Sequence, residues 1–265
     1  MLKIAITGGA GRLAQNLYNC LDKDIIDASL LTRKDADITL VSDMYDALNA
    51  ISPQIVVHCA AMTHPMALHE EQPFHSISAN IIGTAGVAYY CCLNNVKIYY
   101  ISTDWVYQSS SNVKKHLHPE RAYGWSKLGG ECAANMVPRH TILRAAFCHE
   151  PYPHPKAFTD AVKSYMTCTD ASTVIAALLK AEYPNLDNPS LDGTFNLGGP
   201  TRSIYEFVQA KFPEQHILPI SIDDVGEYIP MNTSMDCLPM KRLLKDIAPE
   251  LVDLVGERQI HQGEK

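Results

Sequence analysis

A glycine-rich turn directly after the first apolar segment constrains the fold of this chain more than any other feature. Leu2–Ile6 predicts a short buried strand, and the sequence continues Thr7-Gly8-Gly9-Ala10-Gly11-Arg12-Leu13-Ala14. Glycines permit a tight turn and a close backbone approach, while the N-terminus of the next helix offers free N–H groups and a partial positive charge. This order of strand, turn and helix predicts a binding site for the pyrophosphate of a dinucleotide; the simpler alternative is a structural turn.

Short apolar segments alternate with helical patterns through the first half of the chain. The predicted strands are Leu2–Ile6, Ala28–Leu31, Gln54–His58 and Val96–Ser102. The predicted helices are Gly11–Leu21, Val41–Ile51, Ile77–Leu93 and Trp125–Met136. Apolar strands that are each followed by a helix are typical of a parallel sheet buried on both faces. We therefore predict an α/β fold, a Rossmann-type doubly wound parallel sheet with a small C-terminal substrate-binding lobe.

The pattern changes after Arg144, where Pro151, Pro153 and Pro155 exclude a continuous helix or a central strand. We expect residues 1–149 to form the NAD(P)-binding Rossmann domain, with residues 168–199 packing onto it. Residues 150–167 and 200–265 are expected to form the small lobe. The later elements predicted are a helix over Asp170–Tyr183, a strand over Gly193–Leu197, a helix over Ser203–Lys211 and a helical and loop-like tail from Asp223 to Lys265.

Composition and charge exclude several classes of function. Lys and Arg number 22 against 29 Asp and Glu, so the net charge of −7 argues against a nucleic-acid-binding surface across the chain. The longest apolar runs are far shorter than the ~20 residues of a membrane-spanning helix, and no signal peptide precedes the first strand. Eight cysteines without a C-x-x-C pair predict reduced thiols and no metal site. We expect a cytoplasmic protein with no membrane or nucleic-acid partner; a homodimer remains open.

A second group of residues has the spacing of an active site. Ser102-Thr103-Asp104 follows the fourth predicted strand, and Tyr123 precedes Lys127 by four residues, which places both on one helix face. The ammonium, together with a positively charged nicotinamide, would lower the phenol pKa towards neutrality, so that Tyr123 exchanges a proton with a substrate oxygen. Thr103 would hold the same oxygen. The alternative is an ordinary surface pair on a helix.

Cofactor preference is expected to depend on the end of the second predicted strand. An acidic residue there would bind the ribose 2′-OH of NAD, and a basic residue would accept the 2′-phosphate of NADP. The strand is followed by Thr32, Arg33 and Lys34. These residues favour NADP(H) over NAD(H), with Arg33 at the phosphate, although two solvated loop charges would give the same sequence.

The motifs together resemble a known family, the extended short-chain dehydrogenase/reductases, and within it the dTDP-4-dehydrorhamnose reductase group. The resemblance covers nearly the whole chain. It is carried by Thr7-Gly8-x-x-Gly11, Asp37-Ile38-Thr39, His58-Cys59-Ala60-Ala61-x-Thr63, Asn80-x-x-Gly83-Thr84, Ser102-Thr103-Asp104-Trp105-Val106-Tyr107 and Tyr123-x-x-x-Lys127, and more loosely by Gly193–Gly199 and Pro230–Ser234.

The resemblance implies roles for individual residues. Three would be catalytic, with Tyr123 as general acid: Thr103, Tyr123 and Lys127. The cofactor would contact Gly8, Gly11, Arg12 and Leu13 at the pyrophosphate, Asp37 and Ile38 at the adenine, and Ala60, Ala61, Thr63, Tyr123 and Lys127 at the nicotinamide side. The candidate substrate contacts are Thr103, Asp104, Met62, His64 and Phe147.

The implied activity is an NAD(P)H-dependent oxidoreductase that reduces a nucleotide-linked 4-keto-6-deoxy sugar at C4, a step of deoxysugar and polysaccharide biosynthesis. Two departures concern the substrate side: the segment after Arg144 is shorter than in the group, and Ile229 stands where the group has an arginine. Two alternatives remain open. One is a nucleotide-sugar epimerase or dehydratase of the same fold, and the other is a non-catalytic NADP-binding subunit resembling the methionine adenosyltransferase β subunit.

Overall fold

A parallel six-stranded sheet forms the centre of the computed structural model, which describes residues 1–109, 116–186, 188–226 and 228–256. Its strand order is β10-β5-β4-β3-β1-β2. The strands are β1 (Leu2–Thr7), β2 (Ile26–Leu31), β3 (Ile55–His58), β4 (Lys97–Thr103), β5 (His140–Ala145) and β10 (Gly193–Leu197). All neighbours pair in parallel.

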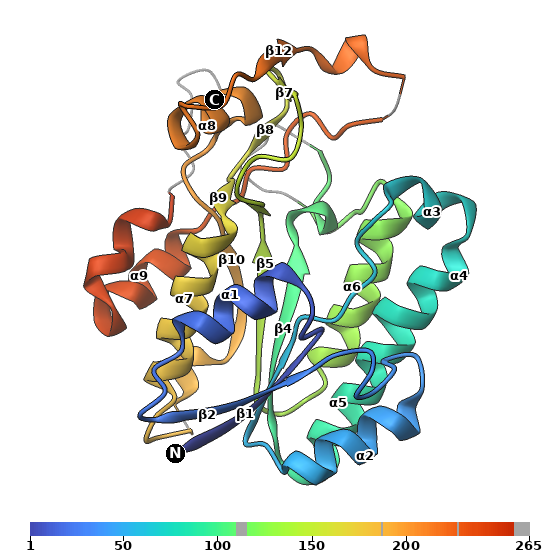
Figure 1. Cartoon of the computed structure of the whole chain (residues 1–265), viewed down its shortest axis with the longest axis vertical. Helices are drawn as coiled ribbons and strands as arrows, with labels where there is room; N and C mark the ends of the chain where they lie inside the picture. The colour runs from blue at the N-terminus through green and yellow to red at the C-terminus, as the bar shows by residue number, and fades with distance from the viewer. Residues whose placement is uncertain (110–115, 187, 227, 257–265) are drawn as a thin grey trace.

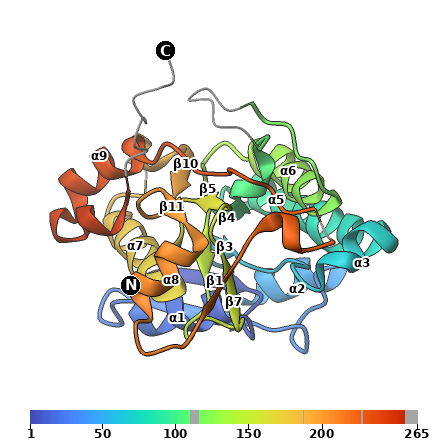
Figure 2. The ribbon, with the colours of Figure 1, turned by 90° about the horizontal axis from the view of Figure 1, so that it is seen from above.

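Helices cover both faces of this sheet (Figures 1 and 2). On one face lie α1 (Arg12–Cys20) and α7 (Cys168–Ala181), which pack against each other. On the other lie α2 (Val41–Ile51), α5 (Gly83–Asn94) and α6 (Ala122–Ala134). The predicted doubly wound α/β fold is therefore confirmed.

Alternate residues of one strand enter two separate cores, which is why the strands are apolar without a polar face. In β1, Ile4 and Ile6 belong to the cluster beneath α1 and α7, whereas Ala5 belongs to the cluster beneath α2 and α5. Every residue of β3 and β4 is buried. Such two-sided burial is the condition that produces continuous apolar strands in parallel sheets.

The predicted strands and helices are present, with ends displaced by a few residues. The start of α6 is the displacement that matters, because the helix begins at Ala122 rather than at Trp125 and so includes Tyr123 in its first turn. The strand β5 was not predicted. Neither were the short helix α3 (Met66–Glu71), the turn of helix α4 (Pro73–Ser76) and the π-helical segment η1 (Ile77–Ile82) that leads into α5.

A small lobe lies beyond the carboxyl ends of the sheet strands, at the top of Figure 1. We use this name for β7 (Lys156–Phe158), β8 (Val162–Lys163), β11 (Arg202–Ser203), α8 (Ile204–Lys211) and β12 (Leu218–Ile220). They surround their own apolar cluster, centred on Ala157, Phe207 and Val208. The pair β6 (Phe147–Cys148) and β9 (Met166–Thr167) connects the sheet to this lobe.

The C-terminal segment was expected to belong to the small lobe. It packs on the core of the sheet instead. In α9 (Leu238–Ile247), Met240 and Leu244 are fully buried in the same cluster as α1 and α7. Residues 257–265 of the predicted tail lie outside the described residues. The remaining elements are the 3₁₀ segments η2 (Asp104–Val106), η3 (Pro189–Leu191), η4 (Ile222–Asp224) and η5 (Pro249–Leu254).

One helical run in the described residues, Pro73–Asn94, is long and apolar enough to cross a membrane by length and composition alone. It comprises α4, η1 and α5, and 44% of its most apolar window is buried inside the fold. Core helices of globular folds pass the same test. This run packs against α2 and α6 and forms part of the layer that covers the sheet. The eight cysteines, all among the described residues, form no disulfide with one another.

Candidate active site

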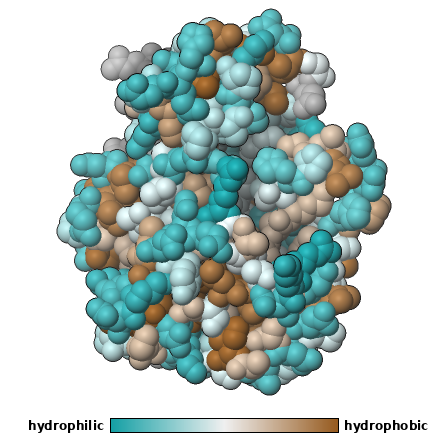
Figure 3. Space-filling model, viewed as in Figure 1, coloured by the Kyte–Doolittle hydropathy of each residue, from teal (hydrophilic) through white to brown (hydrophobic). Residues whose placement is uncertain are grey.

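A single cavity of about 790 Å³ opens at the carboxyl ends of the sheet strands. The strand order reverses direction between β1 and β3, and ligands of doubly wound folds bind in the crevice at such a switch point. Figure 3 shows a hollow between the body that carries the sheet and the small lobe. Every predicted catalytic, cofactor and substrate residue lines this cavity, although they come from segments spread over residues 8 to 147.

The glycine turn forms the floor of the cavity at the end of β1. Gly8 has a φ of +68°, and a Cβ atom there would lie 2.8 Å from the backbone nitrogen and Cα of Ala60. A side chain would therefore be strained and would also push against the loop after β3. Gly11 is the N-cap residue of α1 and contributes no capping side chain. The first turn of α1 therefore borders the cavity with N–H groups that no side chain caps.

Buried hydrogen bonds tie β1, β3 and α5 together behind this turn. The imidazole of His58 lies 2.7 Å from Thr7 Oγ1 through Nδ1 and 3.0 Å from Thr84 Oγ1 through Nε2. Thr84 in turn donates to the carbonyl of Asn80. Burial lowers the pKa of His58 to about 3, and the charge of Lys127 acts in the same direction. His58 is therefore a neutral structural residue.

Asn80 in the π-helical segment η1 fixes the loop that follows β3. Its Oδ1 accepts from the backbone N–H of Met62 at 2.7 Å, and its Nδ2 donates to the Met62 carbonyl at 3.0 Å and to Ser126 Oγ at 2.9 Å. Because Ser126 lies on α6, one buried amide positions the loop against the helix of Tyr123 and Lys127. Local π-helical turns frequently occur at functional sites.

The three predicted catalytic residues meet where β4 and α6 reach the cavity. Thr103 ends β4 and is 5% exposed, Lys127 is 3% exposed, and both line the cavity with Tyr123. The Lys127 Nζ lies 4.3 Å from the centroid of the Tyr100 ring, which gives the ammonium a favourable cation–π contact. Tyr123 makes edge contacts with the rings of His69 at 5.1 Å and Trp105 at 5.8 Å.

The pKa values of Tyr123 and Lys127 both depart from the ordinary values of these groups. Burial raises the pKa of Tyr123 to about 12, with a hydrogen bond to Thr103 acting in the opposite direction and Asp104 raising it further. The charge of Lys127 is not among the causes of this shift, and the expectation that Lys127 and a bound nicotinamide together lower the phenol pKa stays a prediction. Burial lowers the pKa of Lys127 itself to about 7, and Glu131 counteracts this shift. A protonated phenol at neutral pH is the form that a general acid requires.

Close packing fixes α6 over the end of β4. A Cβ atom on Gly124 would collide with the backbone carbonyl of Trp105, so only glycine allows this approach. Two turns further on, Glu131 accepts a hydrogen bond from Ser102 Oγ at 2.5 Å and pairs with Arg144 at 2.7 Å. The ion pair ties α6 to β4 and β5 beneath the catalytic residues.

Asp104, predicted as a substrate contact, has its carboxylate engaged by the protein. Its Oδ2 lies 2.8 Å from Lys163 Nζ and 2.5 Å from Thr233 Oγ1, and Lys163 also donates to Thr233 at 2.8 Å. All three side chains are at most 5% exposed. The cluster connects the end of β4 to β8 of the small lobe and to the segment after Met231, so Asp104 holds the two parts of the cavity together.

The opposite end of the cavity is lined by the loop after β2. Arg33 Nη2 lies 3.0 Å from Asp37 Oδ2, and the Arg33 side chain is 84% exposed. Asp37 also accepts from the N–H and hydroxyl of Thr39, and these bonds hold the pKa of its carboxyl below the ordinary value. Ile38 lies against Gly83 of α5.

Sequence reasoning missed several residues that line the cavity. His149 and Tyr165 are brought to it by β6 and by the approach to β9, which pair over two residues and leave no periodic pattern. His75 and Leu68 come from the unpredicted helices. Among the described residues no group of three His, Cys, Asp or Glu could hold a metal ion.

Comparisons with known proteins identify relatives of this chain. The family model described as RmlD substrate binding domain matches residues 2–214. A dTDP-4-dehydrorhamnose reductase from Sinorhizobium fredii is 29% identical over 156 residues, which are 57% of this chain and 52% of that protein. The chain thus spans about half the length of the curated relatives it matches.

Solved structures resemble the fold over nearly the whole chain. The dTDP-4-dehydrorhamnose reductase from Bacillus anthracis, in complex with NADP, is 25% identical with a TM-score of 0.79 and covers 92% of this chain and 93% of its own. A dTDP-4-dehydrorhamnose reductase from Clostridium acetobutylicum is 22% identical with a TM-score of 0.80, covering 95% and 97%.

Proposed function

Because this chain belongs to the RmlD substrate binding domain family, we propose that it is an NADPH-dependent reductase of a nucleotide-linked 4-keto-6-deoxy sugar. The observation that carries the proposal is the single cavity in which Gly8, Gly11, Thr103, Tyr123 and Lys127 meet. The names of the relatives, which include dTDP-4-dehydrorhamnose reductases and a dTDP-4-keto-6-deoxy-D-glucose reductase, support the substrate class. The NADP in the Bacillus anthracis structure supports the cofactor class.

The residues present fit a nicotinamide dinucleotide. Gly8 allows the turn to approach the backbone of Ala60 closely, and the uncapped start of α1 offers N–H groups to two phosphates. The volume falls within the ~300–1,000 Å³ of small-molecule sites. Arg33, whose guanidinium is exposed at the adenine end, favours the 2′-phosphate of NADP.

In this mechanism the bound nicotinamide supplies the hydride to the sugar C4. Tyr123, protonated at neutral pH, donates its phenolic proton to the O4 atom as negative charge develops there. Thr103, hydrogen-bonded to Tyr123, holds the same oxygen in line with the phenol. Lys127 stabilises the phenolate that remains and binds the ribose hydroxyls of the cofactor. Burial of the Thr103 and Lys127 side chains strengthens these interactions by excluding water.

The test is oxidation of NADPH and of NADH, measured separately by the absorbance of the reduced nicotinamide. The substrates are dTDP-, UDP-, GDP- and CDP-linked 4-keto-6-deoxy sugars. We expect turnover with one nucleotide sugar and a preference for NADPH. Conversion of a nucleotide sugar without net oxidation of the cofactor would instead identify an epimerase or dehydratase. Dinucleotide binding with no turnover on any sugar would indicate a regulatory subunit.

A cytoplasmic location and a homodimer are further parts of the proposal. Eight free cysteines suit a reducing compartment. Sedimentation of the purified protein and fractionation of the cells that produce it test the two points.

A further inference from the structure

One buried polar atom at the cavity has no partner in the protein. The Nδ1 atom of His149 is buried and makes no hydrogen bond to any of the described residues. The ring lies edge-on to Phe147 at 6.5 Å, directly after β6, and lines the cavity. A buried nitrogen without a partner is unfavourable, because it has lost its hydrogen bonds to water. A ligand atom that bonds to it would remove this cost.

Two further basic side chains face His149 across the cavity. Arg12 is the first residue of α1, and His64 lies in the loop after β3. Both line the cavity and repel a proton on His149: burial lowers the pKa of His149, and the charges of Arg12 and His64 lower it further. Three segments far apart in the sequence thus place basic side chains on the lining of one cavity, close enough for Arg12 and His64 to act on the charge of His149.

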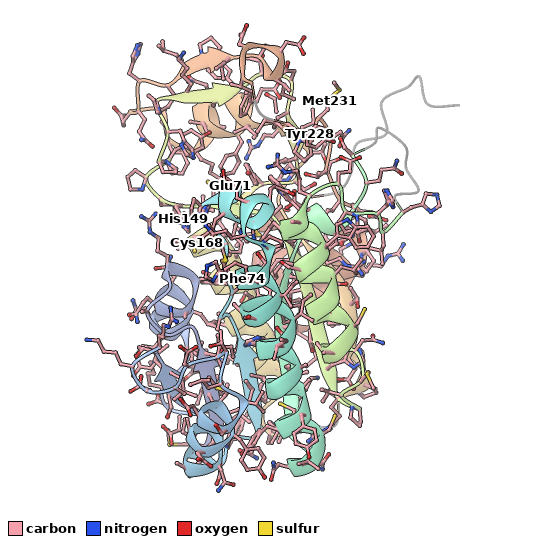
Figure 4. All side chains as sticks on the ribbon, turned by 90° about the vertical axis from the view of Figure 1, so that its right-hand side faces the viewer. Glu71, Phe74, His149, Cys168, Tyr228 and Met231 are labelled. Carbon is pink, nitrogen blue, oxygen red and sulfur yellow. The ribbon has the colours of Figure 1, made fainter. Side chains whose placement is uncertain are left out.

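The acidic groups nearby are engaged elsewhere. Figure 4 shows His149 beside Cys168, as the pairing of Cys148 with Thr167 requires. Glu150 accepts from the N–H of Thr169 at 2.8 Å at the start of α7. Asp170 pairs with Lys211 at 3.0 Å. The titratable and charged groups around His149 are therefore Arg12, His64, Glu150, Cys148, Cys168 and Asp170, and the two carboxylates already have partners.

We propose that His149, together with Arg12 and His64, binds the diphosphate bridge of the dinucleotide from the side opposite the glycine turn. The proposal rests on the proposed function, in which a dinucleotide occupies this cavity. Among the parts of that ligand, the diphosphate is the anion expected at the start of α1, where Arg12 lies. It would accept a hydrogen bond from His149 Nδ1, and its negative charge would offset the repulsion between the three basic groups.

Binding of the diphosphate would be coupled to proton uptake. In the free protein repulsion and burial favour neutral His149, whereas a bound dianion favours the imidazolium. Affinity must then rise as the pH falls, by up to about tenfold per pH unit for each proton taken up. The diphosphate itself stays ionised near neutral pH. The protein is therefore the source of the pH dependence of the affinity.

The test compares dissociation constants of ADP-ribose for the wild type and His149→Gln at about pH 6 and about pH 8, by calorimetry. ADP-ribose carries the diphosphate and lacks the 2′-phosphate, which titrates in this range. We expect the wild type to bind roughly tenfold more tightly at the lower pH and the variant to change less than about threefold. His64→Gln should show a smaller loss of the same dependence. His154→Gln, an exposed histidine away from the cavity, is the matched control.

Each outcome separates the two proposals. An equal pH dependence in wild type and His149→Gln, with a matching result for His64→Gln, would overturn the role of the histidines while NADPH binding and turnover still support the reductase. Failure of NADP⁺ and ADP-ribose to bind at either pH would overturn the proposed function itself. If His149→Gln is poorly folded by its melting temperature, His64→Gln and the proton uptake of the wild type, measured by calorimetry in buffers of different ionisation enthalpy, decide the question.

Discussion

The two sides of the cavity are held by different kinds of contact. On the cofactor side, His58 links neighbouring strands and α5 through neutral hydrogen bonds, and Asn80 adds the loop after β3. On the lobe side, the buried ion pair between Asp104 and Lys163 connects the sheet to β8. Neutral hydrogen-bonded networks within one sheet fix geometry at modest cost, whereas a buried ion pair is strongly destabilising when one partner is lost. The comparison predicts that the cofactor side is rigid and that the attachment of the lobe to the sheet depends on the ion pair between Asp104 and Lys163.

The largest effect is expected for a substitution of Tyr123, which lies where the cofactor side and the lobe side of the cavity meet. Tyr123→Phe removes the proton donor and retains the ring that packs on Trp105 and His69. We expect turnover to fall by about 10³-fold, within the range for loss of a general acid. The dissociation constant of NADPH should change by less than about threefold, because the cofactor side is intact. Steady-state kinetics and fluorescence titration of NADPH measure the two quantities; turnover close to that of the wild type would rule out Tyr123 as the acid.

The second prediction concerns the loss of the buried ion pair on the lobe side of the cavity. Lys163→Met leaves Asp104 buried without its cation, and we expect a loss of about 3–5 kcal/mol in the free energy of unfolding, measured with urea. Adding Asp104→Asn should recover much of that loss, because the unpaired charge is then gone. The matched control is Lys180→Met, which breaks the exposed pair with Asp22 and should change stability by less than about 0.5 kcal/mol. A loss no larger for Lys163→Met than for Lys180→Met would contradict the comparison.

The third prediction concerns acid stability on the cofactor side. The folded-state pKa of His58 is about 3, below the ordinary value of about 6.5, so the unfolded chain binds a proton that the folded chain excludes. The stability contributed by neutral His58 is present above pH 6.5 and is lost as the pH falls towards 3. At pH 4 the loss from this group is about 3 kcal/mol.

Urea unfolding of the wild type and of His58→Gln between pH 7 and pH 4 measures this contribution. The variant starts less stable but should lose less on acidification. Exposed His154→Gln should follow the wild type at every pH. Parallel curves for all three proteins would show that His58 does not link folding to pH.

The difference between the cofactor side and the lobe side also explains which parts of the site the sequence could predict. Gly8 and Thr103 lie in short motifs at the ends of apolar strands, and Tyr123 and Lys127 share one face of a helix, so local pattern was enough to predict a common site. The contacts of the lobe join residues far apart, such as Asp104 with Lys163 and with Thr233, separated by 59 and 129 positions. No local pattern encodes such pairs.

The strands of the lobe were missed for a related reason. The strands β6, β8, β9 and β11 have two residues each, too few for an apolar period to be visible. His149 reaches the cavity only through the pairing of β6 with β9, and was therefore invisible as a ligand-facing residue. The direction in which burial shifts the pKa of Tyr123 was also not predictable, because charge spacing along a helix says nothing about burial.

The smallest effect is expected for a substitution at the exposed end of the cofactor side, where it changes the affinity for NADPH. Arg33 lines the cavity and pairs with Asp37, whereas the neighbouring Lys34 does not line it. Arg33→Asp should weaken NADPH binding about tenfold, or about 1.4 kcal/mol, and leave NADH binding nearly unchanged, since only NADPH carries the 2′-phosphate. Lys34→Asp makes the same change of charge one residue away and is the matched control. If both variants weaken NADPH binding equally, the effect is long-range charge and Arg33 does not contact the phosphate; if only Arg33→Asp does, the exposed end of the cavity selects the cofactor through one side chain.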